Sequence, residues 1–148
     1  MPQAGIEVPD IGARVYHSAS QVIPHIAMTT LAFNSERWDT DTIHDLVINN
    51  SRLTCKTAGK YLISASVEWA PNAVGYRQLV LFLNGGINIA MVNPNANAIA
   101  TTRITISTVY NLAINDYVEV LAYQTSGGNL NINRAGNWTP EFMIQRIG

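Results

Sequence analysis

The chain has 148 residues, a formal net charge of -1 and a single cysteine. This length suits one domain with its own core, and a single cysteine excludes an intrachain disulfide framework. The balanced charge excludes the basic footprint of a nucleic-acid-binding protein, and no apolar run approaches the ~20 residues of a membrane-spanning helix. We therefore expect one folded domain with no nucleic-acid partner and no membrane insertion.

Charged residues make up only 13% of the chain, against about 25% in an average soluble domain, whereas 47% are hydrophobic. Asparagine is abundant, so neutral amide groups supply polarity where charged side chains are few. A chain this poor in charge is typical of a protein that buries part of its surface against copies of itself. The composition therefore favours a homo-oligomer.

Residues 1–12 contain two prolines and two glycines and show no strand or helix pattern. They lack the basic start and the apolar core of a signal peptide, so we do not expect export by the Sec route. We predict an extended N-terminal arm at 1–12, followed by one domain at 13–148. The apolar side chains of the arm are the candidates for attachment to a partner: Ile6, Val8 and Ile11.

From residue 13 onward, short runs with the alternation of β-strands are separated by turn residues, and no window shows a helical period. In the run from Tyr61 to Trp69, odd-numbered residues are apolar and even-numbered ones are mostly polar. The run 79–83 is apolar on both faces, which predicts a strand covered twice, with the outer sheet against a neighbouring subunit. The predicted strands are 13–17, 27–33, 46–48, 51–55, 60–69, 77–83, 87–92, 101–111, 117–124, 129–133 and 141–147.

Turn residues separate these runs. Asn84-Gly85-Gly86 and Ser126-Gly127-Gly128-Asn129 both have the composition of tight hairpin turns, because asparagine and glycine tolerate positive φ. Asn115-Asp116 predicts another turn between two long strands. The segments 71–75 and 93–100 have loop composition, and we expect such loops to crowd one end of a sandwich.

Four segments, taken in order, resemble the globular head domain of complement component 1q and the related tumour-necrosis-factor fold, in the form found in phage and bacterial proteins. They are the opening strand Ala13-Arg-Val-Tyr16, the connection 33–41, the segment 53–61 with its Gly59-Lys-Tyr61 entry into a central strand, and the closing strand Pro140-Glu-Phe142. The sequence departs from the family at Leu53, where an aromatic residue is commoner, and it shows no collagen-like stalk.

This resemblance implies an all-β jelly-roll sandwich of about ten strands that assembles as a tight homotrimer. Aromatic and aliphatic residues of one sheet would then lie against the neighbouring subunits. The residues that this assigns to the core or to the trimer interface are Tyr61, Phe82, Tyr110, Tyr123 and Phe142. The sequence leaves open which of the two environments each occupies.

Glu36, Asp39, Asp41, His44 and Asp45 form the densest group of ionisable side chains. Alternating carboxylates in a loop offer oxygen ligands to a hard cation, which makes the three aspartates the candidate metal ligands. The segment lacks the glycine and terminal glutamate of a calcium loop. We therefore expect no metal and interpret the segment as a solvated turn.

The candidate catalytic side chains are the three histidines, His17, His25 and His44, and Cys55. There is no G-x-S-x-G turn, no H-E-x-x-H and no glycine-rich phosphate loop before a helix. Cys55 is predicted to be a packed thiol at a strand end. We expect neither an enzyme nor a cofactor.

Two loop tryptophans and an asparagine-rich loop are the candidate ligand contacts, because exposed aromatic rings stack on sugars and amides bind hydroxyl groups. These residues are Trp38, Asn93, Asn95, Asn97 and Trp138. We predict a non-enzymatic bacteriophage structural protein, a homotrimeric surface knob that decorates or cements the capsid. It would lie on the virion surface, attached to a capsid or tail protein by its arm. The alternative is a head module of a tail or head fibre that binds a host receptor or surface glycan.

Overall fold

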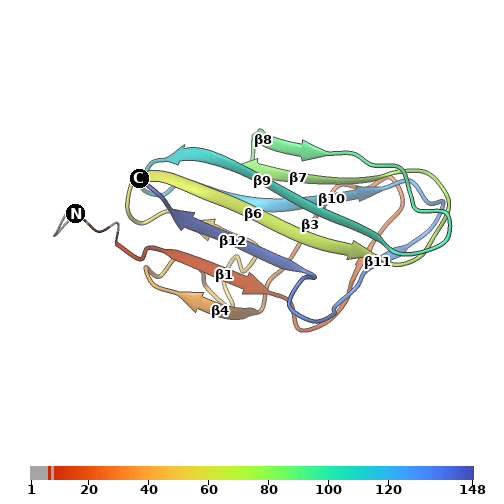
Figure 1. Ribbon diagram of the computed structural model, residues 1–148, viewed down its shortest axis with the longest axis horizontal. Helices are drawn as coiled ribbons and strands as arrows, with labels where there is room; N and C mark the ends of the chain where they lie inside the picture. The colour runs from red at the N-terminus through yellow and green to blue at the C-terminus, as the bar shows by residue number, and fades with distance from the viewer. Residues whose placement is uncertain (1–6, 8) are drawn as a thin grey trace, which may run out of the picture.

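Figure 1 shows the computed structural model, which describes residues 7 and 9–148. The described residues form strands and turns, and none of them lies in a helix long and apolar enough to cross a membrane. The strands are β1 (Gly12–Tyr16), β2 (Gln21–Ile23), β3 (Thr29–Thr30), β4 (Ser35–Asp39), β5 (Leu53–Thr54), β6 (Gly59–Trp69), β7 (Arg77–Leu83), β8 (Ile87–Val92), β9 (Thr102–Leu112), β10 (Tyr117–Gln124), β11 (Leu130–Ile132) and β12 (Glu141–Arg146).

The strands form two antiparallel sheets that pack face to face (Figure 1). The seven-stranded sheet has the order β2-β11-β6-β12-β1-β4, and β9 also pairs with β6. The five-stranded sheet has the order β3-β10-β7-β8, and β5 also pairs with β10. Because the chain crosses repeatedly between the sheets, most neighbours within a sheet are distant in sequence. The predicted all-β jelly-roll sandwich is confirmed.

The core lies between the two sheets. The five odd-numbered residues of β6, from Tyr61 to Trp69, are all buried, as the alternation predicts. They belong to one hydrophobic cluster with inward residues of β7, β10 and β12. Within it, the rings of Phe33 and Phe142 lie with their centroids 5.4 Å apart. Burial of this apolar surface is the main driving force of the fold.

Strand β7 is buried on both faces in its middle. The prediction that the strand 79–83 is covered twice is therefore confirmed for its middle. Leu79 and Leu81 point into the core, and Val80, on the opposite face, is also fully buried. In the neighbouring strands Leu121 of β10 and Met91 of β8 lie in register with Val80. The outward side of the five-stranded sheet thus has its own small apolar centre.

The predicted strand 46–48 is wrong. Its residues form an exposed turn, because the Asp45 carboxylate accepts hydrogen bonds from the backbone N–H groups of Val47 and Ile48, each at 2.8 Å. These local bonds occupy the donors that a strand would offer to a neighbour. The apolar side chains are left at the surface, with Val47 84% exposed.

Other strand boundaries also differ from the prediction. The run 27–33 pairs only over β3, and strands β2 and β4 were not predicted. β4 is an edge strand whose residues are mostly polar, and its register against β1 shifts between Arg14 and Val15. A strand with few apolar residues has no hydrophobic alternation for the sequence to reveal.

Two of the predicted turns are confirmed, and one has a different role. Asn84 and Gly85 have φ of 52° and 68° between β7 and β8, and Asn115 has φ of 76° between β9 and β10. The segment 126–129 does not close a hairpin. It connects β10 of the five-stranded sheet to β11 of the seven-stranded sheet.

Loops gather at the end of the sandwich away from the two termini (Figure 1). Here Tyr76 bridges to Asn95, the N–H of Ala96 donates to the Gly75 carbonyl, and the N–H of Thr125 donates to the Tyr76 carbonyl. The predicted crowding of loops 71–75 and 93–100 at one end is therefore confirmed.

The last residues of the predicted arm lie against the sheet. The Ile11 carbonyl accepts a hydrogen bond from the Arg146 N–H, and the Asp10 carboxylate accepts one from the Gln145 amide at 2.9 Å. Ile11 is half-buried and packs on the core, whereas Ile6 and Val8 lie outside the described residues. Ile11 is thus fastened to β12.

Candidate functional site

The outward side of the seven-stranded sheet is poor in charge at its centre. Cross-strand pairing places Ser64 opposite Ser107 and Ser66 opposite Thr105, with the hydroxyls of the second pair 3.4 Å apart. We call this surface the outer face and define it by its central residues: Leu62, Ser64, Ser66, Thr105, Ser107, Val109, Met143 and Gln145. Short side chains leave such a surface open to close approach by another backbone.

One border of the outer face is an ion-pair cluster around Glu141, whose side chain is only 3% exposed. Its carboxylate accepts hydrogen bonds from Arg14 Nε at 2.8 Å, and from Arg37 Nε at 2.8 Å and Nη2 at 2.9 Å. The bond to Glu141 raises the pKa of Arg37. Both arginines are therefore held by one carboxylate, and the cluster keeps one net positive charge.

The other border carries Glu68 and Arg103, which face each other on β6 and β9. The largely buried Glu68 accepts hydrogen bonds from Arg103 Nε at 2.8 Å and from the Asn133 amide at 3.3 Å. The bond from Arg103 is the main reason why the pKa of Glu68 lies below its usual range, against the opposing effect of burial. This pair is neutral as a whole, and the exposed Lys60 lies at the end of the same face beyond Leu62.

A groove of about 360 Å³ lies beside this pair, lined by Ser66, Arg103, Thr105 and Trp138. The Arg103 guanidinium lies 5.8 Å from the centroid of the Trp138 ring, which is 46% exposed. An open ring beside hydroxyl groups can accept a side chain of a second molecule.

The Glu68–Arg103 pair makes stability depend on pH. Because the pKa of Glu68 is lowered by folding, its contribution is present above the ordinary carboxylate pKa of about 4.3 and is lost as the pH falls through the folded value. We expect Arg103→Gln to lower Tm at pH 7 by about 2–4 °C and to have a smaller effect at pH 3. Thermal melts at the two pH values check this, with the exposed Lys60→Gln as control. An equal loss at both pH values would contradict the assignment.

The acidic segment forms a well-ordered loop. Asp39 Oδ1 accepts hydrogen bonds from the N–H groups of Asp41 and Ile43, and its Oδ2 accepts one from His44. Asp41 accepts a bond from the Thr57 hydroxyl at 2.9 Å. Among the described residues no three acidic, histidine or cysteine side chains converge as metal ligands. The carboxylates shape the loop.

The buried His44 imidazole contacts residues on both sides of this loop in the sequence. Its Nδ1 lies 3.1 Å from Glu36 Oε1, and its Nε2 lies 2.9 Å from the Asn50 carbonyl oxygen. The N–H groups of Ile48 and Val47 hold the pKa of Asp45 below its usual range. The loop therefore has fixed contacts along most of its length.

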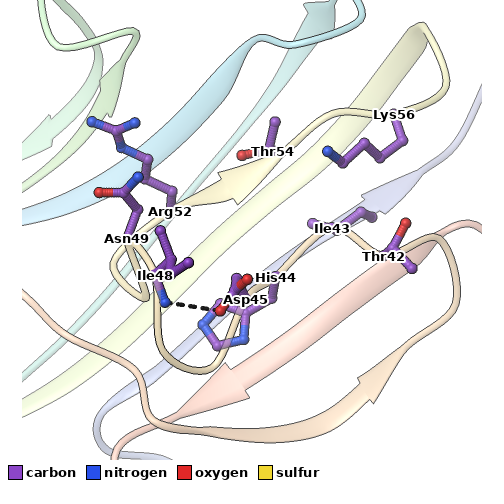
Figure 2. A pocket seen from close by; sticks show the side chains of 9 residues that line it. All are labelled: Thr42, Ile43, His44, Asp45, Ile48, Asn49, Arg52, Thr54 and Lys56. Carbon is purple, nitrogen blue, oxygen red and sulfur yellow. Dashed lines mark hydrogen bonds between the residues drawn. The ribbon is translucent and has the colours of Figure 1, made fainter.

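A pocket of about 390 Å³ opens beside the loop (Figure 2). Its walls combine two cations, one carboxylate, hydroxyl and amide groups and two isoleucines. The lining residues are Thr42, Ile43, His44, Asp45, Ile48, Asn49, Arg52, Thr54 and Lys56. In the view of Figure 2 the amino group of Lys56 points toward the side where Ile48 lies, and Arg52 lies above Ile48 with its guanidinium directed away from the other lining side chains.

The five aromatic candidates divide between two environments. Tyr61 and Phe142 are fully buried within the chain, whereas Phe82, Tyr110 and Tyr123 are half-buried. Tyr110 packs on the core, and Tyr123 stacks at 5.9 Å on Tyr76. The first two are core residues, and an interface role stays a prediction for the other three.

The structure does not bring the candidate ligand residues into one site. Trp38, expected in a loop, lies in edge strand β4 opposite Arg14. The Asn97 side chain accepts a bond from the N–H of Ile99 and so stabilises its own loop. Trp138 is the one of these candidates that lines a described groove.

Cys55 and the histidines serve as structural groups. Burial raises the pKa of the Cys55 thiol, whose Sγ lies 3.2 Å from the Thr57 carbonyl. His25 Nδ1 accepts a bond from the Gly127 N–H, and His17 Nδ1 contacts Ala19. Within the described part of the chain, no histidine ring is hydrogen-bonded to a hydroxyl or thiol.

Sequence reasoning missed the outer face and the pocket. The polar residues of the outer face were visible as the even-numbered positions of β6 and the odd-numbered positions 103–107 of β9, but their side-by-side register depends on the pairing of distant strands. The pocket was missed because the segment 46–48 beside it was predicted to be a strand and because Asp45 was interpreted as part of a solvated turn.

The order of strands in the two sheets defines a jelly roll of the tumour-necrosis-factor type. Eiger TNF from S. frugiperda matches with a TM-score of 0.71 and 12% identity, over 95% of this chain and 94% of that chain. The globular domain of zebrafish complement 1qA gives 0.65 and 12%, over 93% and 98%. Murine APRIL at pH 8.5 gives 0.69 and 8%, over 93% and 99%. These likenesses confirm the predicted fold.

Neither a protein-family model nor a curated protein sequence matches the chain. The similarity is therefore one of fold.

Proposed function

We propose that the chain is a non-enzymatic head domain that assembles as a homotrimer through its outer face. The observation that carries this proposal is the combination of short hydroxyl side chains at the centre of that face with charges that are paired within the chain at its borders. Such a surface can be covered at a low electrostatic cost, because the Glu68–Arg103 pair is neutral and the Arg14–Arg37–Glu141 cluster carries only one net positive charge. Ser64 and Ser107 lie at its centre.

Two further features support self-association. The groove beside Trp138 offers a recess for a side chain of a neighbouring subunit. Charged residues are only 13% of the chain, as expected of a protein whose surface is partly buried in an assembly. A tight threefold assembly is also what the resemblance to complement 1q heads and tumour necrosis factor implies.

We further propose that the trimer decorates or cements the surface of a bacteriophage virion, attached to a capsid or tail protein by the N-terminal arm. Support comes from the sequence pattern, which resembles the phage and bacterial form of the fold, and from the apolar residues Ile6 and Val8. The described arm residues leave the sheet beside β12. This position would let the arm reach a partner surface while the loops at the far end face outward.

Deletion of residues 2–9 tests the role of the arm. The deletion spares the bonds of Asp10 and Ile11 to β12, so we expect unchanged Tm and oligomeric mass. We expect virions assembled with the shortened chain to lack it, as measured by mass spectrometry of purified particles. As a control, the full-length chain with Val74→Ser, changed at the other end of the sandwich, should be incorporated normally. Normal incorporation of the shortened chain would refute attachment by the arm.

A further inference from the structure

The pocket beside the 40–52 loop has the size of a small-ligand site. Its volume of about 390 Å³ lies near the lower end of the range for such sites, roughly 300–1,000 Å³. It is far larger than a single small anion needs and would accept one sugar residue. It is formed within a single chain, so its occupancy does not depend on the proposed trimer.

The charges around this pocket favour an anion. Lys56 is exposed and forms no ion pair among the described residues. Arg52 stacks 4.0 Å above the Tyr117 ring, and its buried Nε has no hydrogen-bond partner there, since Glu119 Oε2 lies 3.9 Å away. The one lining carboxylate, Asp45, already accepts two backbone bonds. Lys56 is therefore the lining cation with capacity for a ligand, because Arg52 is stacked on Tyr117 and paired with Glu119.

The neutral groups of the pocket fit a sugar better than a simple anion. Thr42, Asn49 and Thr54 offer hydroxyl and amide groups to sugar hydroxyls. Ile48 offers an apolar surface, because it is largely exposed although it is aliphatic. A small methyl group, such as that of an N-acetyl substituent, would cover this surface.

The loop that lines the pocket is fixed by its own hydrogen bonds without a ligand. Asp45 fixes the turn at Val47 and Ile48, and the N–H of Arg52 donates to the Asn49 carbonyl at 3.0 Å. His44 joins the loop to Glu36 from below. A site that needs little ordering on binding loses less affinity to conformational entropy.

We propose that this pocket binds an N-acetylated sugar residue that carries a carboxylate. Lys56 would bind the carboxylate, Asn49 and the two threonines would contact the hydroxyls, and Ile48 would cover the acetyl methyl group. Arg52 lines the other side of the pocket, where Tyr117 and Glu119 hold its guanidinium, so Lys56 is the cation that binds the ligand.

Saturation-transfer NMR and calorimetry with the methyl α-glycoside of N-acetylneuraminic acid test the proposal on the full chain. We expect binding of this probe, weaker binding of glucuronic acid, which has no acetyl group, and none of neutral N-acetylglucosamine. Lys56→Gln should weaken binding at least ~10-fold. Lys60→Gln, which changes an exposed lysine outside the pocket, should bind as the wild type does.

Several results would overturn the proposal. They are no binding of the acidic sugar at millimolar concentration, equal binding of N-acetylglucosamine, and an unchanged affinity in Lys56→Gln. If inorganic phosphate displaced the sugar as well as the sugar itself does, the pocket would be a general anion site. This result would also contradict the proposal. Because Lys56 is exposed, an unchanged Tm of the variant should show that its fold is intact.

Discussion

Replacement of Phe142 by alanine should destabilise the domain by about 3–5 kcal/mol. Phe142 is fully buried on β12 and packs against Phe33 at 5.4 Å, between the two sheets. Truncation would remove buried apolar surface and leave a cavity that the surrounding sheets fill only in part. Because natural domains have about 5–15 kcal/mol of stability, this loss would be a large fraction of the total. Urea unfolding monitored by tryptophan fluorescence measures it.

Val47→Ala is the control for this prediction. Val47 is apolar like Phe142 but 84% exposed in the turn that replaced the predicted strand 46–48. Its truncation should change the free energy of unfolding by no more than about 0.5 kcal/mol. A small effect of Phe142→Ala, or a large effect of Val47→Ala, would contradict the burial pattern described above.

Ser107→Arg should convert the proposed trimer into monomers. Ser107 lies opposite Ser64 at the centre of the outer face. A guanidinium there would meet no carboxylate, because Glu68 and Glu141 are already bound to arginines of the same chain. An unpaired charge in a covered interface is strongly unfavourable. Sedimentation velocity should show the mass fall about threefold while Tm and the circular dichroism spectrum still report a folded domain.

Thr30→Arg is the matched control for this change. Thr30 is an exposed hydroxyl residue on β3 of the other sheet, away from the outer face. We expect this variant to keep the mass of the wild type. If Ser107→Arg also kept this mass, the outer face would not be the interface. If both variants dissociated, the effect of Ser107→Arg would not be specific to the outer face, which would contradict the proposal.

The sequence predicts well those strands that are rich in apolar residues and bounded by turn residues. The bounds of β7, β8 and β10 agree with the predicted runs, because apolar residues and turn residues mark both their middles and their ends. β2 and β4 were missed for the opposite reason. They are short strands at the margins of the sheet, and the polar side chains of β4 follow no hydrophobic period.

The candidate sites were harder to predict, because they depend on which distant segments meet. Ser66, Thr105 and Trp138 line one groove although they lie far apart in the sequence. The Lys56 pocket is local in sequence, but its shape depends on the bonds of Asp39 and Asp45 to the loop backbone. Those carboxylates could be interpreted in the sequence only as a solvated turn or as metal ligands.

The mass of the wild-type protein in solution tests the proposed trimer most directly. Sedimentation equilibrium over a wide range of concentrations should give three times the chain mass of 16.2 kDa. A single species of 16.2 kDa at every concentration would contradict the account.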